Sequence, residues 1–204
     1  MDPVHKLAQL FAQFPGIGSR QSKRFVYFLL KQNKSYIKEL VALIETLEEA
    51  VSECARCHRY FMKKHKEGVC CPTCADQRRE RGLLMILEKD SDLEAVEAGG
   101  IYKGLYFVLG GTLPLLEKDP GSKIRINELR KLIDEEFTTM KEIIFAFAVT
   151  PESEHTADYV RGEIEPIANK NLIKLSTLGR GLSTGTELEY SDAETLRYAL
   201  EGRK

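Results

Sequence analysis

No run of apolar residues in this 204-residue chain reaches the roughly 18 that a membrane-spanning helix needs. The first six residues lack the basic stretch and apolar core of a secretory signal. Low-complexity tracts, repeats of 20 to 50 residues, a Walker A phosphate loop and a nucleophile elbow are also missing from the sequence. With 43% hydrophobic and 30% charged residues, the composition predicts a cytoplasmic globular protein with no membrane partner.

The chain also has almost no net charge, because its formal total is −1. The charges are nevertheless unevenly placed. Residues 1–80 hold 14 Lys and Arg against 9 Asp and Glu, whereas residues 81–204 hold 16 against 22. The basic N-terminal segment suggests polyanion binding. The acidic C-terminal segment suggests metal binding, partner binding or a solvated surface. Alternatively, the uneven charge reflects only a chance difference between solvated helix faces.

All five cysteines lie between Cys54 and Cys74. Four form two Cys-x-x-Cys pairs, Cys54 with Cys57 and Cys71 with Cys74, separated by thirteen residues. Two such pairs complete the tetrahedral sulfur set that Zn²⁺ favours, and a cytosolic chain disfavours disulfides. The segment between the pairs is too polar to fold on a core of its own, so a metal would supply its folding energy. We expect one structural Zn²⁺ per chain, with Cys70 as the spare cysteine.

Eight basic residues lie between Arg56 and Arg81. Part of this excess would offset the −2 charge of a zinc tetrathiolate. The basic zinc segment is therefore weaker support for nucleic-acid binding than its composition suggests.

The N-terminal third predicts three helices. The first begins near Pro3 and ends before Pro15, the second would be capped by Ser19, and the third by Ser35. The third helix is predicted to be a packing element, because its apolar residues recur on one face: Ile37, Leu40, Val41, Ile44, Leu47 and Val51.

Between the first two helices, Phe14-Pro-Gly-Ile-Gly18 is typical of a helix-hairpin-helix DNA-binding element. Gly16 and Gly18 would let the backbone approach a phosphate, which amides at a helix N-terminus can bind. The cations that follow would add sequence-independent charge; they are Arg20, Lys23 and Arg24. The alternative is an ordinary helical corner whose glycines only serve the turn.

The remainder of the chain alternates short apolar runs with helical stretches. Strands are expected at 83–87, 105–109 and 143–149, and helices near 91–98 and 127–137. This alternation predicts an α/β domain around a largely parallel sheet. A glycine-rich loop and a final helix, preceded by a capping box at 191–194, follow.

Acidic residues follow two of the predicted strands. Glu88 comes directly after the first, while Glu152 and Glu154 open a helix that Thr150 would cap. Carboxylates from two strand ends could converge on one Mg²⁺. Equally, Glu152 and Glu154 could simply favour the helix dipole, and two residues apart they do not share a helix face.

Taken together, these parts resemble the bacterial RecR family of recombination mediators along essentially the whole chain. The resemblance rests on the glycine hairpin, the cysteine pairs and the run Ile101-Tyr-x-Gly-x-Tyr-Phe-Val-Leu109. It rests further on Arg180-Gly-Leu-x-x-Gly185, on Glu187-Leu-Glu-Tyr190 and on the closing helix.

The resemblance implies a Toprim fold, a structural zinc, and a homodimer or a ring-shaped homotetramer around DNA. It implies a non-catalytic, nucleoid-associated role with RecO and RecF in loading RecA onto single-stranded DNA. By motif position, the family's DNA contacts fall on Arg20 and Arg24, the first Toprim acid on Glu88, and the later pair on Glu152 and Glu154. Toprim domains elsewhere cleave strands with Mg²⁺, so a Mg²⁺-dependent DNA nicking enzyme or nuclease is the alternative function. A purely structural zinc module without a nucleic-acid role is the third.

The sequence departs from the family at two places. The family's Asn-Pro before an acid-Gly-acid segment is here Thr150-Pro151-Glu152-Ser153-Glu154, and the stretch 113–120 differs from the usual loop. Both changes weaken the expectation of Mg²⁺ binding and of some partner contacts.

The expected fold is therefore α+β and multidomain. We assign residues 1–52 to the helix-hairpin-helix region, 53–80 to a four-cysteine zinc finger and 81–176 to the Toprim domain. Residues 177–204 would form a C-terminal tail of loop, strand and helix.

Overall fold

The computed structural model describes residues 2–63, 69–117, 119–182, 185 and 187–202. The chain divides into two compact units, residues 1–52 and 53–204, and each is described by itself. The further division of the second unit into a zinc segment, an α/β domain and a tail stays a prediction.

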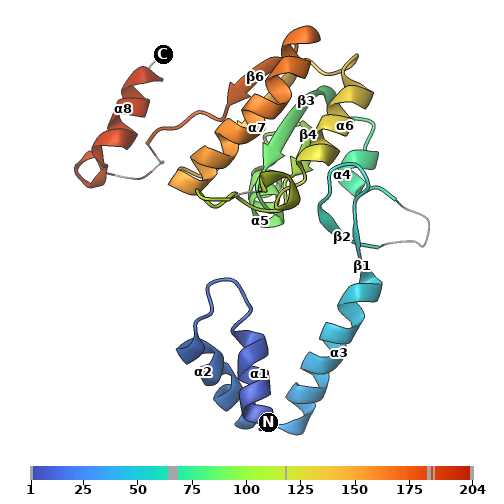
Figure 1. Cartoon of the computed structure of the whole chain (residues 1–204), viewed down its shortest axis with the longest axis vertical. Coiled ribbons are helices and arrows are strands. Elements are labelled where there is room, and N and C mark those ends of the chain that lie inside the picture. Colours follow the sequence, from blue (N-terminus) through green and yellow to red (C-terminus); the bar gives the residue numbers. More distant parts are fainter. Residues whose placement is uncertain (1, 64–68, 118, 183–184, 186, 203–204) are drawn as a thin grey trace. The chain divides into compact units, whose positions relative to one another are not determined.

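The first unit contains the three predicted helices, α1 (Pro3–Phe11), α2 (Ser19–Leu30) and α3 (Lys34–Ala50) (Figure 1). The Asp2 carboxylate caps α1 by accepting from the Val4 N–H at 3.2 Å. The Phe11 ring lies edge-on to the rings of Phe14 and Phe25, at centroid distances of 5.8 and 5.7 Å. These aromatic contacts join α1, the hairpin and α2 around a small core.

Two predicted caps are wrong by one or two residues. Gly18 occupies the N-cap position of α2, so Ser19 is already the first helical residue. Asn33, whose side chain accepts from the Tyr36 N–H at 2.8 Å, caps α3 in place of Ser35. Asn and Ser compete closely as caps, and sequence pattern alone does not fix which one the backbone places at the boundary.

The apolar face of α3 is not buried as predicted. Val41, Ile44 and Leu47 are about half exposed, at 47%, 58% and 58%. Helical periodicity predicts an amphipathic helix correctly, but it does not say which surface covers the apolar face.

The second unit is built on a four-stranded sheet of order β4-β3-β5-β6 in which every neighbouring pair is parallel. Its strands are β3 (Glu80–Leu87), β4 (Gly104–Val108), β5 (Glu142–Ala146) and β6 (Lys174–Thr177). The three predicted strands are confirmed as elements, although β5 ends three residues early. The edge strand β6 escapes the sequence reading because it is short and half polar.

Helices cover both faces of this sheet, which is why its central strands are continuous apolar runs. They are α5 (Asp90–Gly99), α6 (Ile126–Glu136) and α7 (Pro151–Lys170). Alternate β3 residues enter two separate cores: Leu84 and Ile86 join the larger cluster, and Met85 and Leu87 the smaller one. The pairing of β3 with β5 places the carboxyl ends of these two strands side by side.

The remaining elements lie before and after the sheet in sequence. β1 (Val51–Glu53) pairs with β2 (Tyr60–Met62), and a single-turn helix α4 (Pro72–Ala75) precedes β3. In the tail, the expected strand is instead one 3-10 turn, Leu188–Tyr190, followed by α8 (Ala193–Glu201). Within the described residues, no helix has both the length and the apolar character needed to span a bilayer.

Candidate metal centre and nucleic-acid interface

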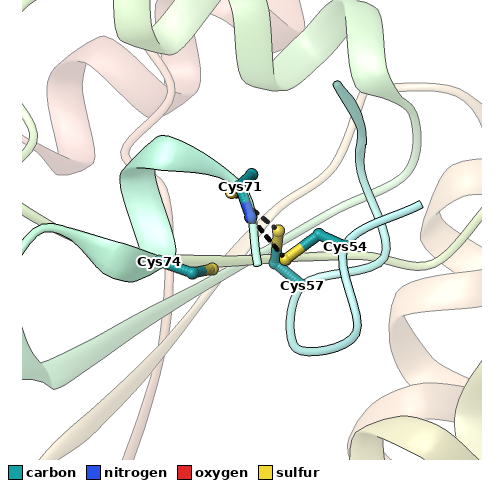
Figure 2. A group of neighbouring side chains, drawn as sticks. All are labelled: Cys54, Cys57, Cys71 and Cys74. Carbon is teal, nitrogen blue, oxygen red and sulfur yellow. Dashed lines mark hydrogen bonds between the residues drawn. The ribbon is translucent and has the colours of Figure 1, made fainter. Parts of the chain in front are cut away.

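The four paired cysteines gather into one buried cluster (Figure 2). Cys54 and Cys57 come from the turn between β1 and β2, while Cys71 caps α4 and Cys74 lies within it. Their sulfur atoms all lie within 4.8 Å of one another, and none of the four residues is more than 5% exposed. Among the described residues, no other group of three or more His, Cys, Asp or Glu side chains is placed to hold a metal ion.

Hydrogen bonds connect the sulfur atoms. The Cys57 and Cys71 sulfurs are 3.6 Å apart, and the Cys71 backbone N–H donates to the Cys54 sulfur at 3.2 Å. Hydrogen bonding from the Cys57 side chain lowers the pKa of Cys54, and the same interaction raises the pKa of Cys57. Four buried thiols so close cannot ionise together unless a cation neutralises them. The donor set therefore fits a tetrahedral Zn²⁺, which binds thiolates.

The cluster has almost no other core. Of the described apolar side chains outside the cluster, only the Phe61 ring packs against the four cysteines. Cys70, predicted to be the spare, is exposed and lies outside the cluster.

Arg56 and Cys57 help to anchor the cysteine segment to the α/β part of its unit. The Arg56 guanidinium binds the Glu136 carboxylate through two hydrogen bonds of 2.8 and 2.5 Å, and its Nη1 lies 3.9 Å from the Cys74 sulfur. Burial acts to lower the pKa of Arg56, but Glu136 and the Cys74 sulfur raise it overall, so the cation is held beside the cluster. The Val108 N–H donates to the Cys57 carbonyl at 2.9 Å and so joins the segment to edge strand β4. No sequence signal indicates these contacts, because Glu136 is 80 residues from Arg56.

In the first unit, the glycine corner exposes its backbone. Gly16 adopts a positive φ of 75°, which favours glycine, and a Cβ at either Gly16 or Gly18 would meet no atom within 4 Å. Gly18 caps α2 without a side-chain hydrogen bond. The amide groups of the first turn of α2 therefore have no acceptor from the capping side chain, and an anion can reach them.

The three predicted cations extend from this corner along α2. Arg20, Lys23 and Arg24 are all exposed, and their three- and four-residue spacing places them on one helix face. Arg24 hydrogen-bonds the Gln21 side chain at 3.2 Å. Across the ranges that the structure describes, none of the three forms an ion pair with an acidic side chain. Their charge remains available to an external anion.

The acidic residues do not form the predicted trio. Glu88, at the end of β3, is buried at 2% exposure, and its carboxylate accepts from the Ala148 N–H at 3.3 Å. Glu152 and Glu154 are exposed in the first turn of α7, and Glu154 pairs with Arg180 at 2.9 Å. The three carboxylates do not lie together as metal ligands would. The helix begins as expected, because the Thr150 hydroxyl accepts from the Ser153 N–H at 3.2 Å.

One contact of the tail has no signal in the sequence. The Arg180 Nη1 also donates to the Tyr198 hydroxyl at 2.9 Å, and its guanidinium lies 5.0 Å from the centre of that ring. Arg180 thus joins the first turn of α7 to α8 through Glu154 and Tyr198.

Comparison with known proteins gives matches along the whole chain. The family model described as "Toprim domain" matches residues 82–175, and the one described as "RecR, C-terminal" matches residues 181–204. The chain is 35% identical to the recombination protein RecR of Pelotomaculum thermopropionicum, over 99% of this chain and 96% of that protein. It is 34% identical to the RecR protein of Dehalococcoides mccartyi, covering 98% and 93% of the two chains. Identity to the RecR protein of Treponema pallidum is 33%, covering 98% and 94%.

Proposed function

Because the chain belongs to the RecR family of recombination proteins, whose role lies in recombinational DNA repair, we propose that it binds DNA without regard to sequence. The observation that carries this proposal is the row of exposed cations, Arg20, Lys23 and Arg24, which have no acidic partner among the described residues and lie beside the open glycine corner. Amides at a helix N-terminus and nearby cations bind phosphate oxygens, which carry no sequence information.

Within this proposal, the four cysteines hold a structural Zn²⁺. A closed set of four thiolates leaves no open position for substrate, so the metal stabilises the segment and does no chemistry. The protein itself acts with RecO and RecF to help load RecA onto single-stranded DNA. It does so as a ring-forming homodimer or homotetramer, which mass measurement in solution with and without DNA would test.

The test of DNA binding is a gel shift with the double variant Arg20→Glu/Arg24→Glu. Reversing two phosphate-binding charges should abolish retention of DNA while the circular dichroism spectrum stays unchanged. The matched control is Lys103→Glu/Lys170→Glu, which changes the net charge equally at exposed positions of the second unit. If the Arg20/Arg24 variant binds as the parent does, or if both variants lose binding equally, α2 is not the DNA-binding face.

We further propose that the protein has no strand-cleaving activity. The separation of Glu88 from Glu152 and Glu154 supports this, since Mg²⁺-dependent cleavage needs carboxylates that share the ion. Supercoiled plasmid incubated with the pure protein and Mg²⁺ should stay intact. Nicking that disappears in Glu88→Gln would show instead that Glu88 is catalytic.

A further inference from the structure

Tyr27 lies in the middle of the basic face of α2. With 3.6 residues per turn, it falls within about 20° of Arg20 around the helix axis and about 10 Å further along it. Lys23 and Arg24 lie on either side of it, one turn back, and Lys31 lies one turn beyond. A large aromatic ring thus continues the line of cations that starts at the glycine corner.

The Tyr27 side chain is 57% exposed, although aromatic rings are among the side chains that gain most from burial. Its neighbours in the first unit pair with one another instead: Phe11 with Phe14 and Phe25, and Phe28 with Tyr36. No described aromatic ring or guanidinium packs on the face of Tyr27. The exposed part of the ring is open to an external partner.

The surroundings of the ring select the chemistry of that partner. Asp2 is the only acidic residue among the first 38, whereas seven basic residues lie there. These charges favour a ligand that carries negative charge close to a flat apolar group. Single-stranded nucleic acid has both, because its phosphates repeat along the backbone and its unstacked bases expose their faces.

We infer that Tyr27 is a base-stacking residue that gives α2 a preference for single-stranded over duplex DNA. The inference rests on the proposed function and deepens it: the cations hold the phosphates, and the tyrosine ring stacks on a base that follows them. In a duplex, the base faces are occupied by neighbouring base pairs, so Tyr27 adds nothing to binding there.

Affinities of two variants test this inference on a 20-nucleotide oligo-dT strand and on a duplex of equal length. Stacking on one base is worth about 5- to 150-fold in affinity. Tyr27→Leu, which removes the ring but keeps an apolar side chain, should therefore weaken single-strand binding by about that factor. Its duplex affinity should stay within about twofold, and Tyr27→Phe should bind both DNAs as the parent does. Because no charge is removed, the salt dependence of binding should not change.

A spectroscopic signature separates stacking from a merely structural role. The chain contains no tryptophan, so Tyr27→Trp introduces a single indole. We expect oligo-dT, but not the duplex, to quench its fluorescence. The control is Tyr190→Trp, at a position 76% exposed in the second unit, which should not respond.

The outcomes distinguish a failure of the stacking role from a failure of the proposed function. Normal single-strand binding by Tyr27→Leu, without quenching in Tyr27→Trp, overturns the stacking role and leaves the cationic interface intact. Absence of DNA binding in the parent protein overturns the proposed function, and the stacking role with it. If the indole signal changes with protein concentration in the absence of DNA, a second copy of the chain covers Tyr27, and the inference is wrong.

Discussion

Removing one zinc ligand should unfold the cysteine segment while the neighbouring sheet persists. In Cys57→Ser, a hydroxyl replaces the sulfur of a residue that is 1% exposed, and this sulfur lies 3.6 Å from that of Cys71. Serine is a poor zinc ligand at neutral pH, so the variant should bind no metal. Among the described residues, Phe61 is the only other apolar side chain packed on the cluster, so the segment has little hydrophobic core without the metal.

The magnitude follows from the two cores. Structural zinc contributes about 10–16 kcal/mol to the folding of small metal-bound segments, whereas a whole domain has a net stability of about 5–15 kcal/mol. Loss of the metal thus removes a folding free energy as large as the net stability of a whole domain, so the cysteine segment should not stay folded. The sheet keeps its own core, in which residues of β3, β4 and β5 are fully buried (Leu84, Ile86, Phe107 and Phe145).

Amide hydrogen exchange identifies the affected bonds directly. Exchange should speed up at amides that the cluster holds in place: Cys54 to the Arg59 carbonyl, His58 to the Cys54 carbonyl, and Ala55 to the Val69 carbonyl. It should also speed up at Val108, whose N–H donates to the Cys57 carbonyl. Amides between β3 and β5 should stay protected.

The control is Cys70→Ser, which makes the same change at the exposed cysteine that precedes Cys71 in the sequence. This variant should retain one zinc per chain by metal analysis and exchange like the parent. If Cys57→Ser is zinc-free yet keeps parental protection at Cys54, Ala55 and His58, the metal does not hold the segment together.

Two further predictions concern charge. Three phosphate contacts by Arg20, Lys23 and Arg24 give a slope of about −2 for log affinity against log salt on single-stranded DNA, so affinity should fall about 20-fold between roughly 50 and 200 mM salt. In Arg20→Gln/Arg24→Gln the slope should shrink to about −0.7, and an unchanged slope measured by fluorescence anisotropy would place the contacts elsewhere. Burial acts to raise the pKa of Glu97, but hydrogen bonds from Arg79 and Tyr106 lower it overall from its ordinary 4.5. The ionised carboxylate therefore stabilises the fold above that pH and loses this contribution as the pH falls below it. Urea unfolding at several pH values should show a smaller acid-side loss of stability in Glu97→Gln, and equal losses would contradict the assignment.

The elements of this fold were largely predictable, because local patterns encode them. The run Leu83–Leu87 is apolar throughout and too short for a helix, so it predicts a strand buried on both faces, and the cysteine spacing brings four sulfurs around one point. Thr150 and Pro151 indicate the start of α7, which the structure confirms. Each of these signals lies within a few residues of the feature that it predicts.

Features that depend on distant residues were not predictable. The Arg56–Glu136 and Arg180–Tyr198 contacts join residues 80 and 18 positions apart. Likewise, Glu88 follows β3 directly and is buried, with its carboxylate bonded to the Ala148 N–H, whereas Glu154 lies in the first turn of α7 and pairs with Arg180. Both carboxylates contact residues far away in the sequence, and the local pattern does not encode such contacts.

The same kind of charge excess has two different meanings in this chain. In the cysteine segment, three of the basic side chains have acidic partners within their own unit: Arg56 binds Glu136, Arg78 binds Asp76, and Arg79 binds Glu97. These cations balance internal carboxylates and, at Arg56, a sulfur of the metal cluster. Arg20, Lys23 and Arg24 on α2 have no such acidic partner among the described residues, and they surround an exposed ring. A phosphate that binds Arg56, Arg78 or Arg79 would have to displace a carboxylate. A phosphate that binds the cations of α2 displaces only water and counterions. The DNA-binding face is therefore expected at α2, although both regions are basic by composition.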